Sequence, residues 1–99
     1  MKNVIVVCEA GITTSLLVTK LNELAQENDE EIRINSKSTE EGLEYVKEKP
    51  VDAVLLVPQI HHKEEEYRKV TNGKVLKVSV SDFNNMNAFS IFEQLNEAI

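Results

Sequence analysis

The chain has 99 residues, of which 41% are hydrophobic, and 11 Lys and Arg against 17 Asp and Glu give a formal net charge of −6. This length and composition fit one folded domain spanning residues 1–99 and exclude a disordered or fibrous protein. The acidic balance argues against nucleic acid as the main partner and is compatible with a basic protein partner, and no apolar run approaches the roughly 20 residues of a membrane span.

The first predicted strand covers residues 3–7, an apolar run typical of a buried central strand. A helix is predicted to begin at Thr13 or Thr14 and to end near Asn28. A loop of small and hydroxyl residues therefore joins the strand to the helix. The apolar side of this helix follows from repeats of three and four residues, and comprises Leu16, Leu17, Lys20, Leu21 and Leu24.

The next segment repeats this order of strand and helix. Ile32 and Ile34 alternate with polar residues, which predicts a strand that is less buried than the first. Ser38 and Glu41 form the pattern of a capping box, in which each side chain bonds a backbone N–H of the other residue. A second helix is therefore expected to begin here, and it should stop before Pro50.

The third strand is predicted over residues 51–57, the strongest apolar run after the first, and Pro58 closes it. The segment 61–71 is polar and rich in Glu. It is expected to form a mostly exposed helix with Tyr67 and Val70 turned inward.

A fourth strand is predicted over residues 74–80, and a last helix is predicted from about Asn87. Alternation of strand and helix is the signature of an α/β fold, an open four-stranded parallel sheet with helices on both faces. In such sheets ligands bind beyond the carboxyl ends of the strands. The expected apolar side of the last helix, interpreted as core, comprises Phe89, Phe92, Leu95 and Ile99.

Cys8 is the only cysteine, and it follows the first predicted strand directly. A thiol there lies beside the positive end of a helix, where both a thiolate and a bound phosphate are favoured. Gly11 gives the loop conformational freedom, and its hydroxyls add hydrogen-bond donors. The candidate phosphate-binding loop comprises Glu9, Ala10, Gly11, Ile12, Thr13, Thr14 and Ser15. This arrangement favours covalent phosphoryl transfer through a phosphocysteine, and the alternative is an inert cysteine at a strand end.

Other anion-binding motifs fit this loop less well. It has neither the Gly-Lys-Ser/Thr of a Walker A motif nor the several glycines of a dinucleotide-binding loop. Cysteine-dependent phosphatases of low molecular mass carry Cys, five residues, Arg and Ser/Thr. Here Thr14 replaces that Arg, which would clamp the phosphate, and Ser15 matches the last position. Asp82 is a conceivable acid for such an enzyme, but without the Arg a phosphatase is disfavoured.

Two segments together resemble the lactose/cellobiose-type enzyme IIB of the bacterial sugar phosphotransferase system. The first is Cys8-x-Ala10-Gly11-x-x-Thr14-Ser15-Leu16-Leu17-Val18, and the second is Asp52-x-Val54-Leu55-Leu56-x-Pro58-Gln59-Ile60. The resemblance implies a parallel sheet of order 2-1-3-4, similar to the low-molecular-mass tyrosine phosphatase fold. It also implies that Cys8 is the phosphorylated nucleophile, that the loop 9–15 holds the phosphate, and that Pro58 and Gln59 form a neighbouring loop.

The partners implied by this resemblance are a IIA protein, whose phosphohistidine donates the phosphoryl group, and a IIC membrane subunit, which carries the accepting sugar. No metal or organic cofactor is implied. With one cysteine the chain forms no internal disulfide, so we expect a cytoplasmic protein with a reduced thiol, and we expect a monomer.

Three residues depart from the family pattern. Glu9 replaces a small polar residue, and its carboxylate would repel a phosphate dianion, unless it points toward the basic rim of a partner. Ile12 replaces a common Met, and Val57 replaces a frequent Gly. Glu9 leaves open an alternative in which the chain is a paralogue that senses an anion or docks on a regulator.

His61 and His62 follow the second motif. They are either a second phosphoryl carrier or proton donor near the thiol, or two solvated residues at a helix start, and the resemblance favours the second interpretation. A metal site would need at least a third ligand, and the sequence offers none beyond Cys8.

Overall fold

The computed structural model describes residues 1–9 and 15–99. The elements of the first half are β1 (Lys2–Cys8), α1 (Ser15–Glu27), β2 (Ile32–Ser38), α2 (Thr39–Glu48) and β3 (Ala53–Leu56). Those of the second half are a 3-10 helix η1 (Pro58–Lys63), α3 (Glu64–Val70), β4 (Lys74–Lys77), α4 (Val80–Asn84) and α5 (Ala88–Ala98).

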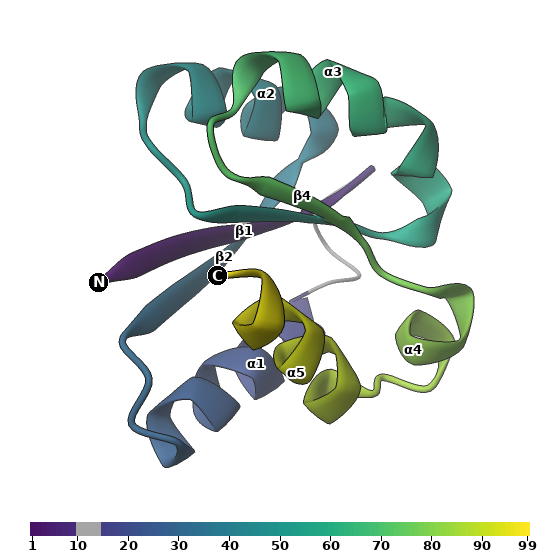
Figure 1. The fold of residues 1–99 in the computed structure, drawn as a ribbon. Helices are drawn as coiled ribbons and strands as arrows, with labels where there is room; N and C mark the ends of the chain where they lie inside the picture. Colours follow the sequence, from purple (N-terminus) through teal and green to yellow (C-terminus); the bar gives the residue numbers. More distant parts are fainter. Residues whose placement is uncertain (10–14) are drawn as a thin grey trace.

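The strands form one parallel sheet in the order β2-β1-β3-β4, which confirms the predicted fold class and strand order. Helices α2 and α3 cover one face, whereas α1, α4 and α5 lie on the other (Figure 1). Because β1 and β3 are central and covered on both faces, their apolar residues form the core, and Val4–Val7 have no exposed surface.

The start of α2 agrees with the sequence prediction. The Ser38 hydroxyl accepts a hydrogen bond from the Glu41 backbone N–H, and a Glu41 carboxylate oxygen accepts one from the Ser38 N–H. The inward positions of α3 are confirmed as well, since Tyr67 is fully buried and Val70 is half-buried.

The predicted apolar side of α1 is partly wrong. Leu16 is 57% exposed and Lys20 is also exposed, whereas the buried residues are Leu17, Leu21 and Ala25. Each step along a helix turns by about 100°, so Leu16 points away from the stripe that its neighbour Leu17 begins. The predicted start at residue 13 or 14 lies outside the described residues.

The predicted helix over 61–71 is two elements. Pro58 opens the 3-10 helix η1, and Ile60 has a non-helical backbone (φ −124°, ψ 25°). Regular α-helix begins only at Glu64, so both histidines precede α3 instead of beginning it.

The predicted fourth strand is too long, because the chain turns into the short helix α4 at Val80. The Ser79 hydroxyl caps α4 by accepting a hydrogen bond from the Asp82 N–H. A Ser three residues before an Asp is the signal that could have indicated this helix.

The last helix begins after its N-cap Asn87, as predicted, but Phe89 is 62% exposed and is not part of the core. Phe92 and Leu95 are buried as expected, and Ile91 takes the place that was predicted for Phe89. No helix within the described parts of the chain is both long and apolar enough to span a membrane.

Candidate functional site

Cys8 lies at the carboxyl edge of the sheet, at the end of β1, and only 2% of its surface is exposed. In the parallel register it pairs with Ser38, the last residue of β2. Strand β1 has β2 on one side and β3 on the other, so Cys8 occupies the point at which the strand order reverses. This is the position where open α/β sheets bind ligands.

The chain leaves β3 beside this cysteine. The Val57 N–H donates to the Val7 carbonyl oxygen (3.2 Å), and η1 begins at the next residue, Pro58. The Ile60 N–H closes the first turn on the Val57 oxygen (3.0 Å), and its side chain is 3% exposed. Pro58 and Gln59 are thereby held next to the end of β1.

A hollow of about 460 Å³ opens at this edge. The sequence prediction included Glu9 and Gln59 among the site residues, and both line the hollow. The sequence prediction did not include residues from the end of β2 and the start of α2. The capping box could have indicated them, because it marks Ser38 as the end of a strand, and parallel strands end at the same edge of a sheet. The residues that line the hollow are Glu9, Ser38, Thr39, Glu40, Gln59, Ile60, His62 and Lys63.

Charges of both signs surround the hollow. Glu9 and Glu40 are exposed carboxylates, and His62 is an exposed imidazole. The Lys63 ammonium, which is on the same rim, pairs with the Glu66 carboxylate at 3.2 Å. The edge can therefore offer both donors and acceptors to a partner.

Next to the hollow, the hydrogen bonds from the Ser38 backbone and hydroxyl hold the pKa of Glu41 below its ordinary value, and the charge of Lys37 contributes to the same shift. The capping carboxylate is thus ionised at neutral pH. It fixes the turn through which Ser38 and Thr39 reach the hollow.

The two histidines have different surroundings. His61 Nε2 lies 2.8 Å from the carbonyl oxygen of Val78, to which it donates, and Val78 in turn donates its N–H to Leu56 O at 2.8 Å. His61 is half-buried and links η1 to the end of β4, so the expectation of a solvated residue is wrong for it. His62 is exposed and faces the hollow.

Most of the predicted phosphate-binding loop lies outside the described part of the chain, namely Ala10, Gly11, Ile12, Thr13 and Thr14. Ser15 is the exposed first residue of α1.

Asp82, the conceivable acid of a phosphatase, has a structural contact instead. Its carboxylate accepts hydrogen bonds from Ser90 Oγ and Gln94 Nε2, both at 3.1 Å, so it links α4 to α5. In residues 1–9 and 15–99 no three His, Cys, Asp or Glu side chains are grouped to hold a metal ion.

The family of this chain follows from the similarity of its sequence to known protein families. The model described as "PTS system, Lactose/Cellobiose specific IIB subunit" matches residues 3–94. The chain belongs to this family. Members are IIB components of sugar phosphotransferase systems and work with IIA and IIC components.

Individual relatives agree with this assignment. The oligo-beta-mannoside-specific EIIB component of Bacillus subtilis (strain 168) is 35% identical over 82 residues, 83% of this chain and 78% of that protein. The lactose-specific IIB domain of Streptococcus pneumoniae superimposes with a TM-score of 0.81 at 16% identity, over 98% of this chain and 96% of that one. The cellobiose-specific IIB component of Borrelia burgdorferi gives 0.74 at 24% identity, over 98% and 90%. The two structures establish the shared fold, which is the low-molecular-mass phosphatase-like fold.

Proposed function

We propose that this IIB chain is a cytoplasmic phosphocarrier that accepts a phosphoryl group on Cys8 from a IIA phosphohistidine and passes it to a sugar held by a IIC membrane subunit. The observation that carries the proposal is the position of Cys8, at the end of the central strand β1 and at the reversal of strand order. In this role the chain needs no metal or organic cofactor and acts as a monomer.

Each transfer is a substitution at phosphorus. The Cys8 thiolate attacks the phosphohistidine, the S–P bond forms, and the P–N bond breaks to release the imidazole of IIA. A sugar hydroxyl then attacks the same phosphorus, loses its proton, and displaces the thiolate, which completes the cycle. The loop 9–15 holds the phosphoryl oxygens, and the N-terminus of α1 stabilises their charge.

Two further groups have supporting roles in this proposal. Pro58 and Gln59 begin η1 beside the end of β1, where Gln59 lines the hollow and Pro58 fixes the turn that places it there. Glu9 is exposed at the hollow and faces the basic rim of a partner. Absence of the clamping Arg slows hydrolysis of the phosphocysteine, which preserves the group for transfer.

The accepting sugar is proposed to be a β-linked di- or oligosaccharide. The B. subtilis relative is named for oligo-beta-mannosides, and the two structural neighbours are named for lactose and cellobiose. The choice among such sugars belongs to the IIC subunit, because the carrier needs to reach only the reacting hydroxyl.

The decisive measurement is the intact mass of the chain after incubation with phosphoenolpyruvate, the general phosphotransferase proteins and a cognate IIA. One added phosphoryl group in the parent and none in Cys8→Ser is expected. No addition in the parent, with IIA shown to be phosphorylated, would overturn the proposal in favour of an anion-sensing or docking paralogue. Steady phosphate release from an aryl phosphate that depends on Cys8 would instead indicate the phosphatase.

A further inference from the structure

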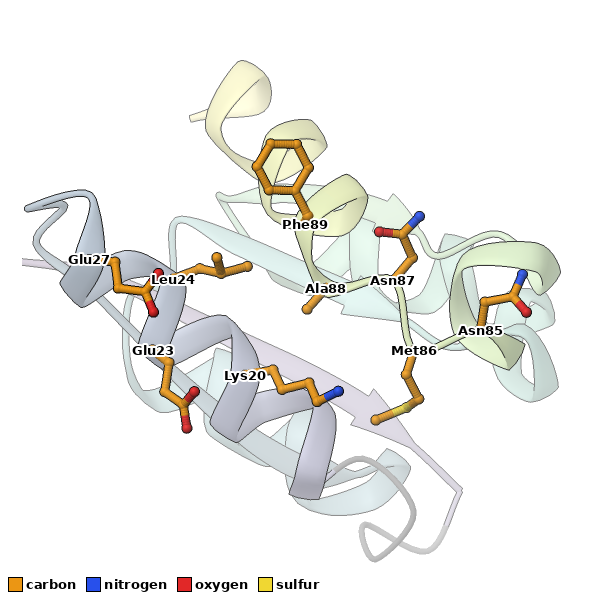
Figure 2. A pocket seen from close by; sticks show the side chains of 9 residues that line it. All are labelled: Lys20, Glu23, Leu24, Glu27, Asn85, Met86, Asn87, Ala88 and Phe89. Carbon is orange, nitrogen blue, oxygen red and sulfur yellow. The ribbon is translucent and has the colours of Figure 1, made fainter.

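A second open site lies on the face of the molecule that carries α1 and α5. It is a groove of about 520 Å³ between α1 and the turn that joins α4 to α5 (Figure 2). The groove shares no residue with the hollow beside Cys8. Its lining includes Lys20, Glu23, Leu24 and Glu27 of α1, Met86 of the turn, and Phe89 of α5.

The groove presents apolar surface to solvent. The Phe89 side chain is 62% exposed, and Leu24 and Met86 are half-buried and pack against the core. In Figure 2 the Leu24 side chain extends from α1 toward Ala88 at the start of α5. An exposed apolar residue by itself is ordinary, but here one exposed and two half-buried apolar side chains line the same groove, which is the composition of a contact surface.

Met86 provides an independent observation. Its φ of 52° lies in the left-handed region, which a residue other than glycine adopts only with strain. Hydrogen bonds impose this conformation, since Asn87 N donates to Asp82 O (2.8 Å) and Ala88 N donates to Met86 O (2.9 Å). A glycine would satisfy the turn without strain. The methionine therefore adds nothing that the turn requires, and what it adds is a flexible apolar side chain in the groove.

The α1 wall of the groove is acidic. Glu23 and Glu27 lie one helical turn apart, and neither forms an ion pair within the described parts of the chain. Lys20 is the one cation among the residues that line the groove. The complementary occupant carries apolar side chains for the floor and Lys or Arg for this wall, which is the pattern of a basic amphipathic helix.

We infer that this groove docks a basic amphipathic cytosolic segment of the IIC membrane subunit, an inference that rests on the proposed function. Cytosolic loops of membrane proteins carry an excess of Lys and Arg, which complements this acidic wall and a chain of net charge −6. The groove also leaves the catalytic edge open. Its α1 residues, from Lys20 to Glu27, lie roughly 8 to 18 Å along the helix axis from Ser15, and none of its lining residues is in the hollow beside Cys8. The carrier can thus be held at the membrane while Cys8 faces the sugar.

The test compares two separate measurements. The first is the dissociation constant of the chain for lipid vesicles that contain the cognate IIC, with empty vesicles as the blank. The second is phosphorylation of Cys8 by IIA, read by intact mass. The first does not depend on phosphorylation, so a failure of the proposed function and a failure of the docking inference give different results.

Three groove variants should raise the dissociation constant for IIC vesicles about tenfold, because each removes one apolar contact residue or the charged pair of the wall. Phosphorylation by IIA should stay at the parent rate. The variants are Phe89→Ala, Met86→Gly, and the double variant Glu23→Gln with Glu27→Gln. The double variant should also reduce the dependence of binding on salt. Met86→Gly relieves backbone strain but also removes a half-buried apolar side chain, so urea denaturation must show that the variant is folded before its loss of binding is ascribed to the groove.

Matched controls come from outside the groove. Val80→Ala removes an exposed apolar side chain (58% exposed), and Glu93→Gln with Glu97→Gln removes two exposed carboxylates one turn apart on α5. Both controls should bind like the parent. Equal binding by the groove variants and the parent, or no binding of the parent above empty vesicles, would overturn the inference. So would a loss confined to phosphorylation by IIA, or a parent dimer that Phe89→Ala dissociates.

Discussion

The two helical layers on this sheet differ in one feature each: a buried tyrosine joins α3 to α2, whereas an open groove borders α1, and we call them the closed and the open layer. On one face, α3 packs on α2 through Tyr67, which is fully buried and donates its hydroxyl proton to the Thr39 carbonyl oxygen at 2.7 Å. On the other face, α1 and α5 leave a groove of about 520 Å³ with Phe89 exposed at its side (Figures 1 and 2). Both layers are built from amphipathic helices, so amphipathicity alone does not determine whether a layer is closed.

The closed layer depends on one small residue. Gly42 of α2 lies directly against the Tyr67 hydroxyl, where no β-carbon would fit. The same contact serves the site, because Tyr67 holds Thr39, the first residue of α2 and part of the hollow beside Cys8. The closed layer therefore fixes the position of Thr39 at the carboxyl edge, and the open layer leaves a groove.

The largest expected effect comes from forcing the closed layer apart. In Gly42→Ala the new β-carbon would clash with the Tyr67 hydroxyl oxygen, and we expect a loss of about 2 kcal/mol of unfolding free energy although alanine favours helix. Urea denaturation measures this loss.

The double variant Gly42→Ala with Tyr67→Phe tests whether this clash is the cause of the loss. Without the hydroxyl, the nearest remaining ring atom is Cζ, 3.3 Å from the place that the alanine β-carbon would occupy, so the double variant should be more stable than the sum of the single changes predicts. Additive losses would show that the contact does not limit the approach of α3 to α2.

A smaller effect is expected from the open layer when its internal tie is removed. Asp82→Ala deletes the acceptor for Ser90 and Gln94, and we expect a loss of about 1.5 kcal/mol, again by urea denaturation. Asp82→Asn keeps an acceptor oxygen and should lose less. Phosphorylation of Cys8 should persist in both variants, and phosphate release from an aryl phosphate by the parent but not by the folded Asn variant would make Asp82 a candidate acid again.

The pH dependence of stability should also distinguish the layers. Burial, with a contribution from the charge of Glu66, raises the pKa of Tyr67 above its ordinary value. Above pH 10 the unfolded chain releases this proton first, so unfolding free energy should fall with rising pH, by at most about 1.4 kcal/mol per pH unit. Relative to Tyr67→Phe, the parent should show this fall from about pH 10 upward, and parallel curves of unfolding free energy against pH would contradict the burial of the Tyr67 hydroxyl.

The smallest expected effect is a gain in the open layer. Asp29 follows α1 with φ 55°, and the chain ends this helix with Glu30 N donating to Ala25 O (2.8 Å) and Asp29 N donating to Gln26 O (3.2 Å). This is the hydrogen-bond pattern that usually has glycine in the left-handed position. Asp29→Gly should therefore raise the free energy of unfolding by about 0.5–1 kcal/mol, which is measured as a higher melting temperature. Asp29→Ala, which keeps a β-carbon, is the control and should give no gain.

Local patterns were sufficient for much of the fold. The apolar run of β1, the capping box of Ser38 and Glu41, and the start of the last helix at about Asn87 each depend on neighbouring residues, and each is confirmed. The position of Cys8 at a strand end followed from the same run. These features are readable because strand alternation, helix periodicity and capping are set within one or two turns of the chain.

The sequence by itself thus determined the alternation of four strands with helices, the parallel sheet and the place of Cys8 at its carboxyl edge. Only the tertiary structure decided that Phe89 is exposed while Ile91 is buried, that His61 bonds Val78, and that Ser38 borders the hollow. These outcomes depend on which helix or strand packs against a given face, and the residues involved are far apart in the chain. Local periodicity shows which side of a helix or strand is apolar, but it does not show which other element packs against that side.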